Sequence, residues 1–130
     1  MASIFSRIIS GEIPCHKIAE NDHYFAFLDI MPLAPGHVLV VPKKETDYIF
    51  DLDDDILGGI LPFAKDIAKA MEKVMPCERI GISVIGLEVP HAHVHLIPLR
   101  TMDDINFSRP KLKMSSAELE EIANKIRSAL

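Results

Sequence analysis

Three histidines alternate with apolar residues in the stretch His91-Ala92-His93-Val94-His95-Leu96-Ile97-Pro98, and this alternation constrains the fold more than any other feature of the chain. In a β-strand, residues i, i+2 and i+4 point to one face, with about 6.6 Å between successive members. The pattern therefore predicts a strand over Val89–Pro98 with three imidazoles on one face. Ala92, Val94 and Leu96 then point to the opposite face, into a core.

The other segments predict an α+β fold built on an antiparallel sheet. Tyr24–Ile30 and His37–Val41 are rich in aromatic and β-branched residues, as strands are. The short stretch between them contains two prolines and a glycine, so the two strands are expected to pair antiparallel. A further strand is expected over Ile80–Ile85, with a turn at Gly86 before the histidine strand.

Helical periodicity predicts a short amphipathic helix in the first ten residues, a main helix over Ile56–Val74 and a final helix that begins at Ser115 or Ser116. Pro62 lies inside the main helix, so the helix either bends there or begins its regular part there. Thr101–Lys113 shows no clear period and is expected to be a loop.

Length and charge restrict the domain organisation and the class of partner. A chain of 130 residues with 48% hydrophobic residues is expected to form one domain over residues 1–130. Its net charge of -5 disfavours a sequence-independent grip on polymeric nucleic acid, which needs a basic stripe. A small nucleotide, held by a few directed contacts, is compatible with that charge.

The two cysteines and the apolar segments indicate a cytoplasmic protein. Cys15 and Cys77 are far apart and neither belongs to a Cys-x-x-Cys pair, which favours a reducing compartment. The first ten residues lack the continuous apolar core of a signal peptide, and no later stretch reaches the length of a membrane span. No membrane partner is expected.

Three interpretations of the alternating histidines compete. They could be surface residues on a half-buried strand, but histidine has no special strand propensity that would favour three in strict alternation. They could bind a metal, but three ligands from one flat strand face lie nearly in a line, whereas tetrahedral zinc needs them to converge. They could transfer a phosphoryl group, since a neutral imidazole is a nitrogen nucleophile near neutral pH. The strand geometry favours this last interpretation.

With apolar residues between and after the histidines, the His-x-His-x-His motif resembles the signature of the histidine triad (HIT) family, in its small branch of nucleotide phosphoramidases and nucleotidyl hydrolases. Three further blocks are similar to family sequences and occur in the family order. The resemblance spans roughly residues 4–98, and a loop and the C-terminal helix follow over 99–130. The three blocks are Ile8–Pro14, Ala26–Ile30 and Ala34–Lys44.

The resemblance implies a HIT-like antiparallel sheet with two main helices, a homodimer, and transfer of a nucleoside monophosphate first to histidine and then to water. It implies that His93 is the nucleophile, that His95 contacts the phosphate, and that His91 and His37 support them. The expected partner is a small purine nucleoside monophosphate derivative. The positions that hold the nucleoside in similar proteins correspond to Phe27, Asp29 and Ile30. Each of these three also has an ordinary structural interpretation, as core or as a turn cap.

The chain departs from the family at a metal site. Many similar proteins carry Cys-x-x-Cys near the start and a histidine after the Pro-Lys-Lys block, and these complete a structural zinc site with the first triad histidine. Here the corresponding residues are Ser3, Ser6 and Glu45. Hydroxyls are poor zinc ligands, so we expect no bound metal and no cofactor.

A second departure lies in the loop before the triad. Leu87 stands where similar proteins have a glutamine that reaches the phosphate and the leaving group. This leaves open a nucleotide-binding or regulatory module with weak or no turnover. The homodimer is further supported by the main helix, whose apolar residues exceed what one small sheet is expected to cover. Those residues are Ile60, Phe63, Ile67 and Met71.

Overall fold

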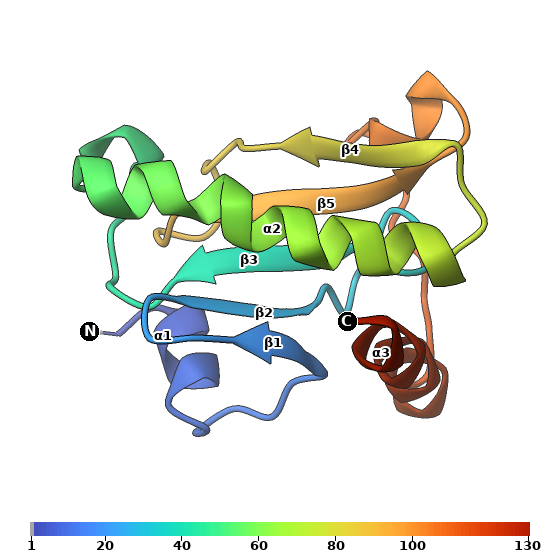
Figure 1. Ribbon diagram of the computed structural model, residues 1–130, viewed down its shortest axis with the longest axis horizontal. Helices are drawn as coiled ribbons and strands as arrows, with labels where there is room; N and C mark the ends of the chain where they lie inside the picture. The colour runs from blue at the N-terminus through green and yellow to red at the C-terminus, as the bar shows by residue number, and fades with distance from the viewer. Residues whose placement is uncertain (1) are drawn as a thin grey trace.

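The computed structural model describes residues 2–130, which form a five-stranded antiparallel sheet with three α-helices (Figure 1). The strand order is β1-β2-β3-β5-β4, and each neighbouring pair is antiparallel. The predicted α+β class is confirmed. The strands are β1 Lys17–Glu20, β2 Tyr24–Leu28, β3 Val38–Pro42, β4 Arg79–Ser83 and β5 Val94–Leu99, and the helices are α1 Ile4–Ile9, α2 Asp54–Val74 and α3 Ser116–Ala129.

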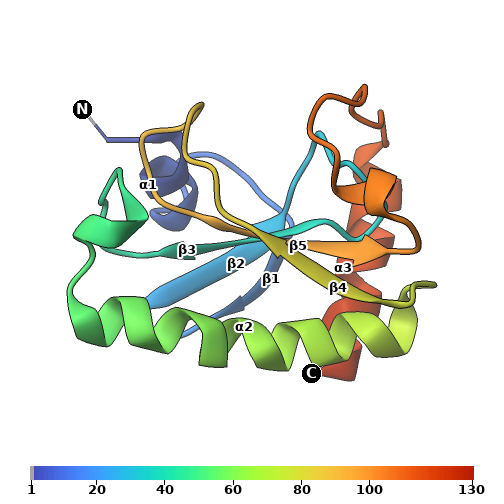
Figure 2. The ribbon, with the colours of Figure 1, turned by 90° about the horizontal axis from the view of Figure 1, so that it is seen from above.

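The helices divide the sheet into two unlike faces. Helix α2 crosses one face, while α1 and the loops that precede β5 and follow it lie on the other (Figure 2). Helix α3 packs against α2 and the edge strand β1. The main core fills the space between the sheet and α2, where Val40, Val94 and Leu96 meet Ile67 and Met71. As the alternation predicts, Val94 and Leu96 point into this core.

A smaller apolar cluster lies on the opposite face, beneath α1. It consists of Phe5, Phe25, Phe27, Leu39 and Val41, all buried. Phe5 enters it from α1, whose N-cap is Ser3: the Ser3 side chain accepts a hydrogen bond from the Ser6 N–H. This packing and capping fix the N-terminal segment beside the sheet face that carries the histidines.

One predicted strand ends earlier than expected, and one strand of the fold is not predicted from the sequence. Strands β2 and β3 match the predictions closely, whereas the predicted strand over 80–85 ends at Ser83 in β4. Strand β1 is not predicted because it has four residues and buries only Ile18. The region predicted as loop after Thr101 contains a short 3-10 helix, Met102–Ile105, with a capping box from Thr101 and Asp104.

Helix α2 is continuous from Asp54 to Val74, so its regular part does not begin at Pro62. The same helix corrects part of the argument for a dimer. Ile60, Ile67 and Met71 are buried in the chain's own core and Phe63 packs against it, so they leave no surplus apolar face. Any dimer must use other residues.

The C-terminal helix begins where the sequence predicts. Ser115 is the N-cap, and it forms a reciprocal capping box with Glu118. Across residues 2–130, the structure has no helix both long and apolar enough to cross a membrane.

Candidate active site

Strand register places His95 at the centre of the histidine-bearing face. His95 pairs with Leu39 on β3 and with Ser83 on β4, and Leu39 pairs in turn with Phe27 on β2. Directly opposed residues in antiparallel strands share a face. Phe27, Leu39, His95 and Ser83 therefore form one row across the sheet.

The triad does not lie within a single strand, contrary to the prediction. Strand β5 begins at Val94, so only His95 belongs to it, and His91 and His93 occupy the extended segment just before it. The backbone of that segment bonds to loops instead of a neighbouring strand: Ala92 N–H donates to the Thr46 carbonyl and His91 N–H to the Val89 carbonyl. The side chains still alternate, because all three imidazoles lie on the side opposite the α2 core.

All three triad histidines are buried, which excludes the interpretation as surface residues. His91, His93 and His95 are 0, 7 and 8% exposed. The Phe5 ring lies edge-on to His93, with 5.0 Å between ring centroids, and His93 and His95 are 4.9 Å apart. Phe5 is not among the predicted site residues, although its helical spacing with Ile8 indicates that it is buried.

Hydrogen-bond partners fix the proton positions on His37 and His95. The Leu33 backbone N–H donates to His37 Nδ1 at 3.1 Å, so Nδ1 carries no proton. The proton of the neutral ring is then on Nε2, which donates to His95 Nδ1 at 2.9 Å. The proton of neutral His95 is therefore on its Nε2, as a hydrogen-bond donor. Gly36, at φ +87°, makes the turn that sets His37 in this position.

His93 has the opposite arrangement. Its Nδ1 lies 2.7 Å from the backbone carbonyl of His91, and a carbonyl can only accept, so Nδ1 carries the proton. Nε2 of the neutral ring then has a free lone pair. The site thus holds a nucleophilic nitrogen on His93 beside an N–H donor on His95.

Burial keeps these rings neutral. It is the largest cause lowering the pKa of His37 to about 3 and that of His95 to about 4, and it also lowers the pKa of His93. The charged form of an imidazole is disfavoured when water is excluded. At neutral pH the lone pair on His93 is therefore available.

His91 is joined to the N-terminal segment by a continuous polar network. Its Nε2 donates to the Pro42 carbonyl at 2.8 Å, and its Nδ1 lies at hydrogen-bond distance, 2.7 Å, from the Ser3 hydroxyl. Glu45 Oε1 accepts from the Ser3 N–H at 2.6 Å and from the Ser6 hydroxyl at 2.7 Å. These bonds lower the pKa of Glu45 to about 2.

The network occupies the positions of the family's zinc ligands, and its donors do not fit zinc. Ser3, Ser6, Glu45 and His91 come together as the resemblance implies, but two of them offer neutral hydroxyls and both His91 nitrogens already have partners. Structural zinc sites are built from thiolates and imidazoles. In this chain, hydrogen bonds take the place of the metal ligands.

A second group has ligand atoms close enough for a metal, but its two facing nitrogens are already bonded to each other. Asp29, His37 and His95 each place one such atom within 4.8 Å of the others. His37 Nε2 and His95 Nδ1 are bonded to each other, and Asp29 Oδ1 accepts from the Met31 N–H at 2.9 Å. The nitrogens that face each other share one proton and leave no lone pair for an ion.

The three residues that the resemblance places at the nucleoside lie at one end of β2 and differ in exposure. Phe27 is buried in the apolar cluster, 5.5 Å from the Phe5 ring. Asp29 follows the strand, with Oδ2 3.7 Å from His37 Nε2, and burial raises its pKa. Ile30 is exposed. Asp29 also caps the turn to Met31, as its structural interpretation anticipates.

Two residues from the C-terminal loop, residues 100–113, also reach the site, and no sequence pattern identifies them. The Phe107 ring lies edge-on to His95, with 4.8 Å between centroids, and 6.4 Å from His37. Lys111 Nζ lies 5.1 Å from the centroid of Phe107. Their segment lacks a helical or strand period, so only the fold reveals that it lies against His95 and His37.

The chain belongs to the HIT family. A family model described as HIT domain matches residues 10–102. The chain is 35% identical to the adenosine 5'-monophosphoramidase hnt1 of Schizosaccharomyces pombe, over 98% of this chain and 100% of that protein, and 34% identical to an uncharacterised HIT-like protein of Borreliella burgdorferi, over 95 and 94%. It resembles the crystal structure of a Hit-like protein involved in cell-cycle regulation from Bartonella henselae, with a TM-score of 0.86, 35% identity and coverage of 98 and 96%.

Proposed function

We propose that the protein is a nucleotide hydrolase that cleaves a nucleoside monophosphate from an amine or phosphate leaving group. The observation that carries this proposal is the pair of nitrogens that the site presents: an unprotonated Nε2 on His93 and a protonated Nε2 on His95. Similarity to the S. pombe phosphoramidase supports the same reaction class.

In the first step, His93 Nε2 attacks the α-phosphorus and forms a phosphorus–nitrogen bond. The bond to the leaving group breaks, and its electron pair leaves with the amine, which takes up a proton from solvent. His95 Nε2–H donates to a phosphoryl oxygen, where negative charge gathers in the transition state. Water then attacks phosphorus, the electron pair of the bond returns to His93 Nε2, and a proton goes to solvent.

The supporting histidines act through hydrogen bonds. His37 orients His95 and holds it in the tautomer that donates from Nε2. The backbone of His91 orients His93, while its ring is held by Ser3 and Pro42. Each reacting ring thus has a partner that sets both its direction and its proton, as preorganised catalysis requires.

The nucleoside is expected to bind beside β2. Asp29 has one carboxylate oxygen bonded to the Met31 N–H and a second that is available to ribose hydroxyls. Ile30 offers exposed apolar surface for a purine base, while Phe27 supports the floor of the site from the buried cluster. No metal or organic cofactor is needed for this reaction.

We further propose that the chain forms a homodimer through the edge strand β4. Ile82 in β4 is 53% exposed, and Val84 and Ile85, which follow the strand directly, are 41 and 46% exposed. They line an apolar groove of ≈ 680 Å³ together with Tyr48 and Leu61, and the same groove reaches His93, so a partner paired at β4 would lie beside the active site. An exposed apolar edge strand is a ready surface for pairing with another copy.

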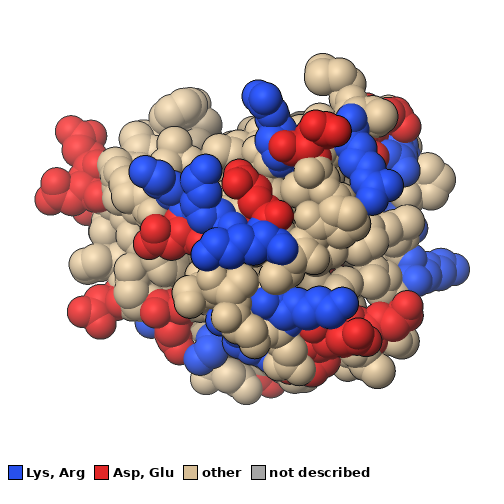
Figure 3. All heavy atoms as spheres, turned by 45° about the vertical axis from the view of Figure 1, so that its right-hand side comes forward, with Lys and Arg blue, Asp and Glu red and all other residues tan. Residues whose placement is uncertain are grey.

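We propose that the protein is located in the cytoplasm and that small molecules, not polymeric nucleic acid, are its binding partners. Cys15 and Cys77 are both free thiols, in keeping with a reducing compartment. On the face shown in Figure 3, lysine and arginine alternate with aspartate and glutamate and form no continuous basic stripe. This supports the expectation that polymeric nucleic acid is not a partner.

A second candidate function is nucleotide binding with little turnover. Leu87 is 88% exposed and carries no polar group toward the phosphate. The loop before the triad therefore does not supply the leaving-group contact that a glutamine would.

Hydrolysis of adenosine 5'-phosphoramidate separates the two functions. The first predicts multiple turnovers with release of AMP and ammonia. Stoichiometric binding of AMP without turnover would instead establish the second, and absence of both would contradict the nucleotide assignment. His23→Ala, which alters an exposed histidine outside the site, is the matched control.

A further inference from the structure

Three buried histidines of the site, His37, His93 and His95, present no positive charge to an anionic substrate. All three are neutral at pH 7 because burial lowers their pKa values. The carboxylates of Asp29 and Glu88 also act on this site: Asp29 lies beside His37, and Glu88 raises the pKa of both His93 and Asp29. A phosphoryl group that carries negative charge therefore needs a cation from elsewhere in the chain.

Lys111 is placed to supply that cation. Its ammonium and the imidazole of His95 both contact the Phe107 ring, at 5.1 and 4.8 Å from the ring centroid. The charge of Lys111 lowers the pKa of His37, His95 and Asp29, which places it within electrostatic reach of all three. Lys111 is thus linked to the very histidine that is proposed to donate to the phosphate.

The ammonium group of Lys111 has hydrogen-bond donors that are not used within the described residues. A lysine has three N–H donors. Over residues 2–130, Lys111 Nζ has one hydrogen-bond acceptor, the Phe107 carbonyl at 3.2 Å, and no carboxylate within ion-pair distance. Two donors are left for a ligand.

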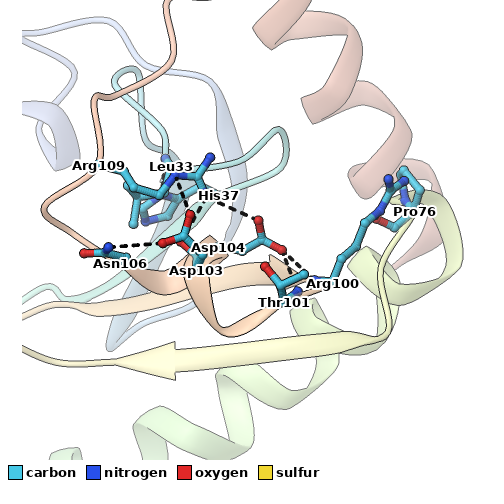
Figure 4. A network of polar contacts seen from close by, with 9 residues as sticks. All are labelled: Leu33, His37, Pro76, Arg100, Thr101, Asp103, Asp104, Asn106 and Arg109. Carbon is cyan, nitrogen blue, oxygen red and sulfur yellow. Dashed lines mark hydrogen bonds and ion pairs between the residues drawn. The ribbon is translucent and has the colours of Figure 1, made fainter.

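The loop that carries Lys111 is held in place at several points. Arg109 pairs with Asp103 and Asp104 at 3.5 and 3.3 Å, and Asp104 also accepts from the Thr101 N–H at 2.9 Å (Figure 4). Just beyond Lys111, the Leu112 N–H donates to the Pro32 carbonyl at 2.8 Å. This anchoring reduces the entropy cost when the lysine engages a ligand.

We propose that Lys111 is a phosphate-binding residue, which contacts the phosphoryl group of the nucleotide on the His95 side and partly substitutes for the polar interaction that the Leu87 side chain is unable to make. The inference rests on the proposed function, since it assigns a further ligand contact in the same site. A charge-assisted hydrogen bond to phosphate is among the stronger polar contacts in proteins.

The test compares binding of AMP and adenosine, which differ only in the phosphate, by titration calorimetry. Lys111→Met keeps the aliphatic stem that packs beside Phe107 and removes the charge. We expect it to weaken AMP binding about tenfold or more and to leave adenosine binding within about twofold. Lys111→Arg should recover most of the AMP affinity. Lys113→Met, an exposed lysine two residues away, is the matched control and should bind AMP like the unaltered protein.

Two results would overturn the role of Lys111 alone: AMP affinity unchanged in Lys111→Met, or an equal decrease in affinity for AMP and adenosine, which would indicate a structural role. Equal melting temperatures of the variants exclude a folding defect as the cause. If the unaltered protein binds neither AMP nor adenosine, the proposed function fails together with this inference.

Discussion

His37 Nε2 donates a hydrogen bond to His95 Nδ1 at 2.9 Å, and this bond determines which nitrogen of His95 carries the proton. The Leu33 N–H donates to His37 Nδ1, which places the proton of His37 on Nε2, the nitrogen that faces His95. The two histidines are 58 residues apart in the chain and meet because β3 and β5 are neighbours.

Removing the His37 donor should slow turnover more than it weakens binding. We expect His37→Ala to lower kcat about 10- to 100-fold with a smaller change in KM, because His95 is no longer held in its donating tautomer. His37→Gln, whose amide N–H can reach a similar position, should recover part of the activity. Equal kcat values for both variants and the unaltered protein would contradict this role.

The buried histidines should make the fold sensitive to mild acid. In the unfolded chain they have the ordinary pKa of 6.5, whereas in the fold burial lowers the pKa of His37 to about 3 and of His95 to about 4. Below pH 6.5 the unfolded state therefore binds more protons than the folded state. The contribution of these histidines to the free energy of unfolding is complete above pH 6.5 and is lost as the pH drops toward 3.

Each such histidine contributes a slope of up to about 1.4 kcal/mol per pH unit. Glu20 and Glu45, whose pKa values are lowered from 4.5 to about 2, add their own destabilisation only at lower pH. Urea unfolding between pH 7 and 5 thus isolates the histidines. His37→Gln should show a shallower slope over that interval. A free energy of unfolding that does not change across it would contradict the burial argument.

The purified protein should contain no stoichiometric zinc and need none to fold. Ser3, Ser6, Glu45 and His91 satisfy one another by hydrogen bonds and lack thiolates. Elemental analysis of untagged protein should find far less than one zinc per chain, and a strong chelator should leave the melting temperature unchanged. Near-stoichiometric zinc with a large drop in melting temperature on chelation would contradict this, since structural zinc contributes on the order of 10 kcal/mol.

The dimer proposed through β4 predicts a specific sensitivity to charge. Ile82→Lys should shift the protein from dimer to monomer in light scattering at micromolar concentration, because a lysine on an edge strand opposes pairing. Leu130→Lys, which alters an exposed apolar residue at the end of α3, a helix that packs against α2 and the opposite edge strand β1, should stay dimeric. A monomer in the unaltered protein would rule the dimer out.

Sequence patterns predicted most of the fold because the strongly periodic segments form their own elements. Alternation placed Val94 and Leu96 in the core and the imidazoles opposite, while helical spacing placed α2 and α3. Strand β1 was not predicted because four residues with one buried side chain show little periodicity.

The sequence predicted those site residues that lie close together in the chain, and it did not predict those that only the fold brings together. His91, His93 and His95 are identified by spacing, but their proton positions depend on Leu33, Ser3 and a backbone carbonyl, which only the fold brings near. Phe107 and Lys111 come from a segment without a pattern. Their role depends on the path of the C-terminal loop over the sheet.

His93 Nε2 is predicted to become bonded to phosphorus during turnover. Rapid mixing of the protein with adenosine 5'-phosphoramidate, followed by alkaline quenching and mass spectrometry, measures this directly, because a phosphorus–nitrogen bond to histidine survives alkali. We expect an adenylyl group on the peptide that contains His93, formed and removed at the rate of turnover, and neither adduct nor AMP release in His93→Ala. Continued multiple turnover in His93→Ala, or turnover in the unaltered protein with no adduct on His93, would contradict the claim.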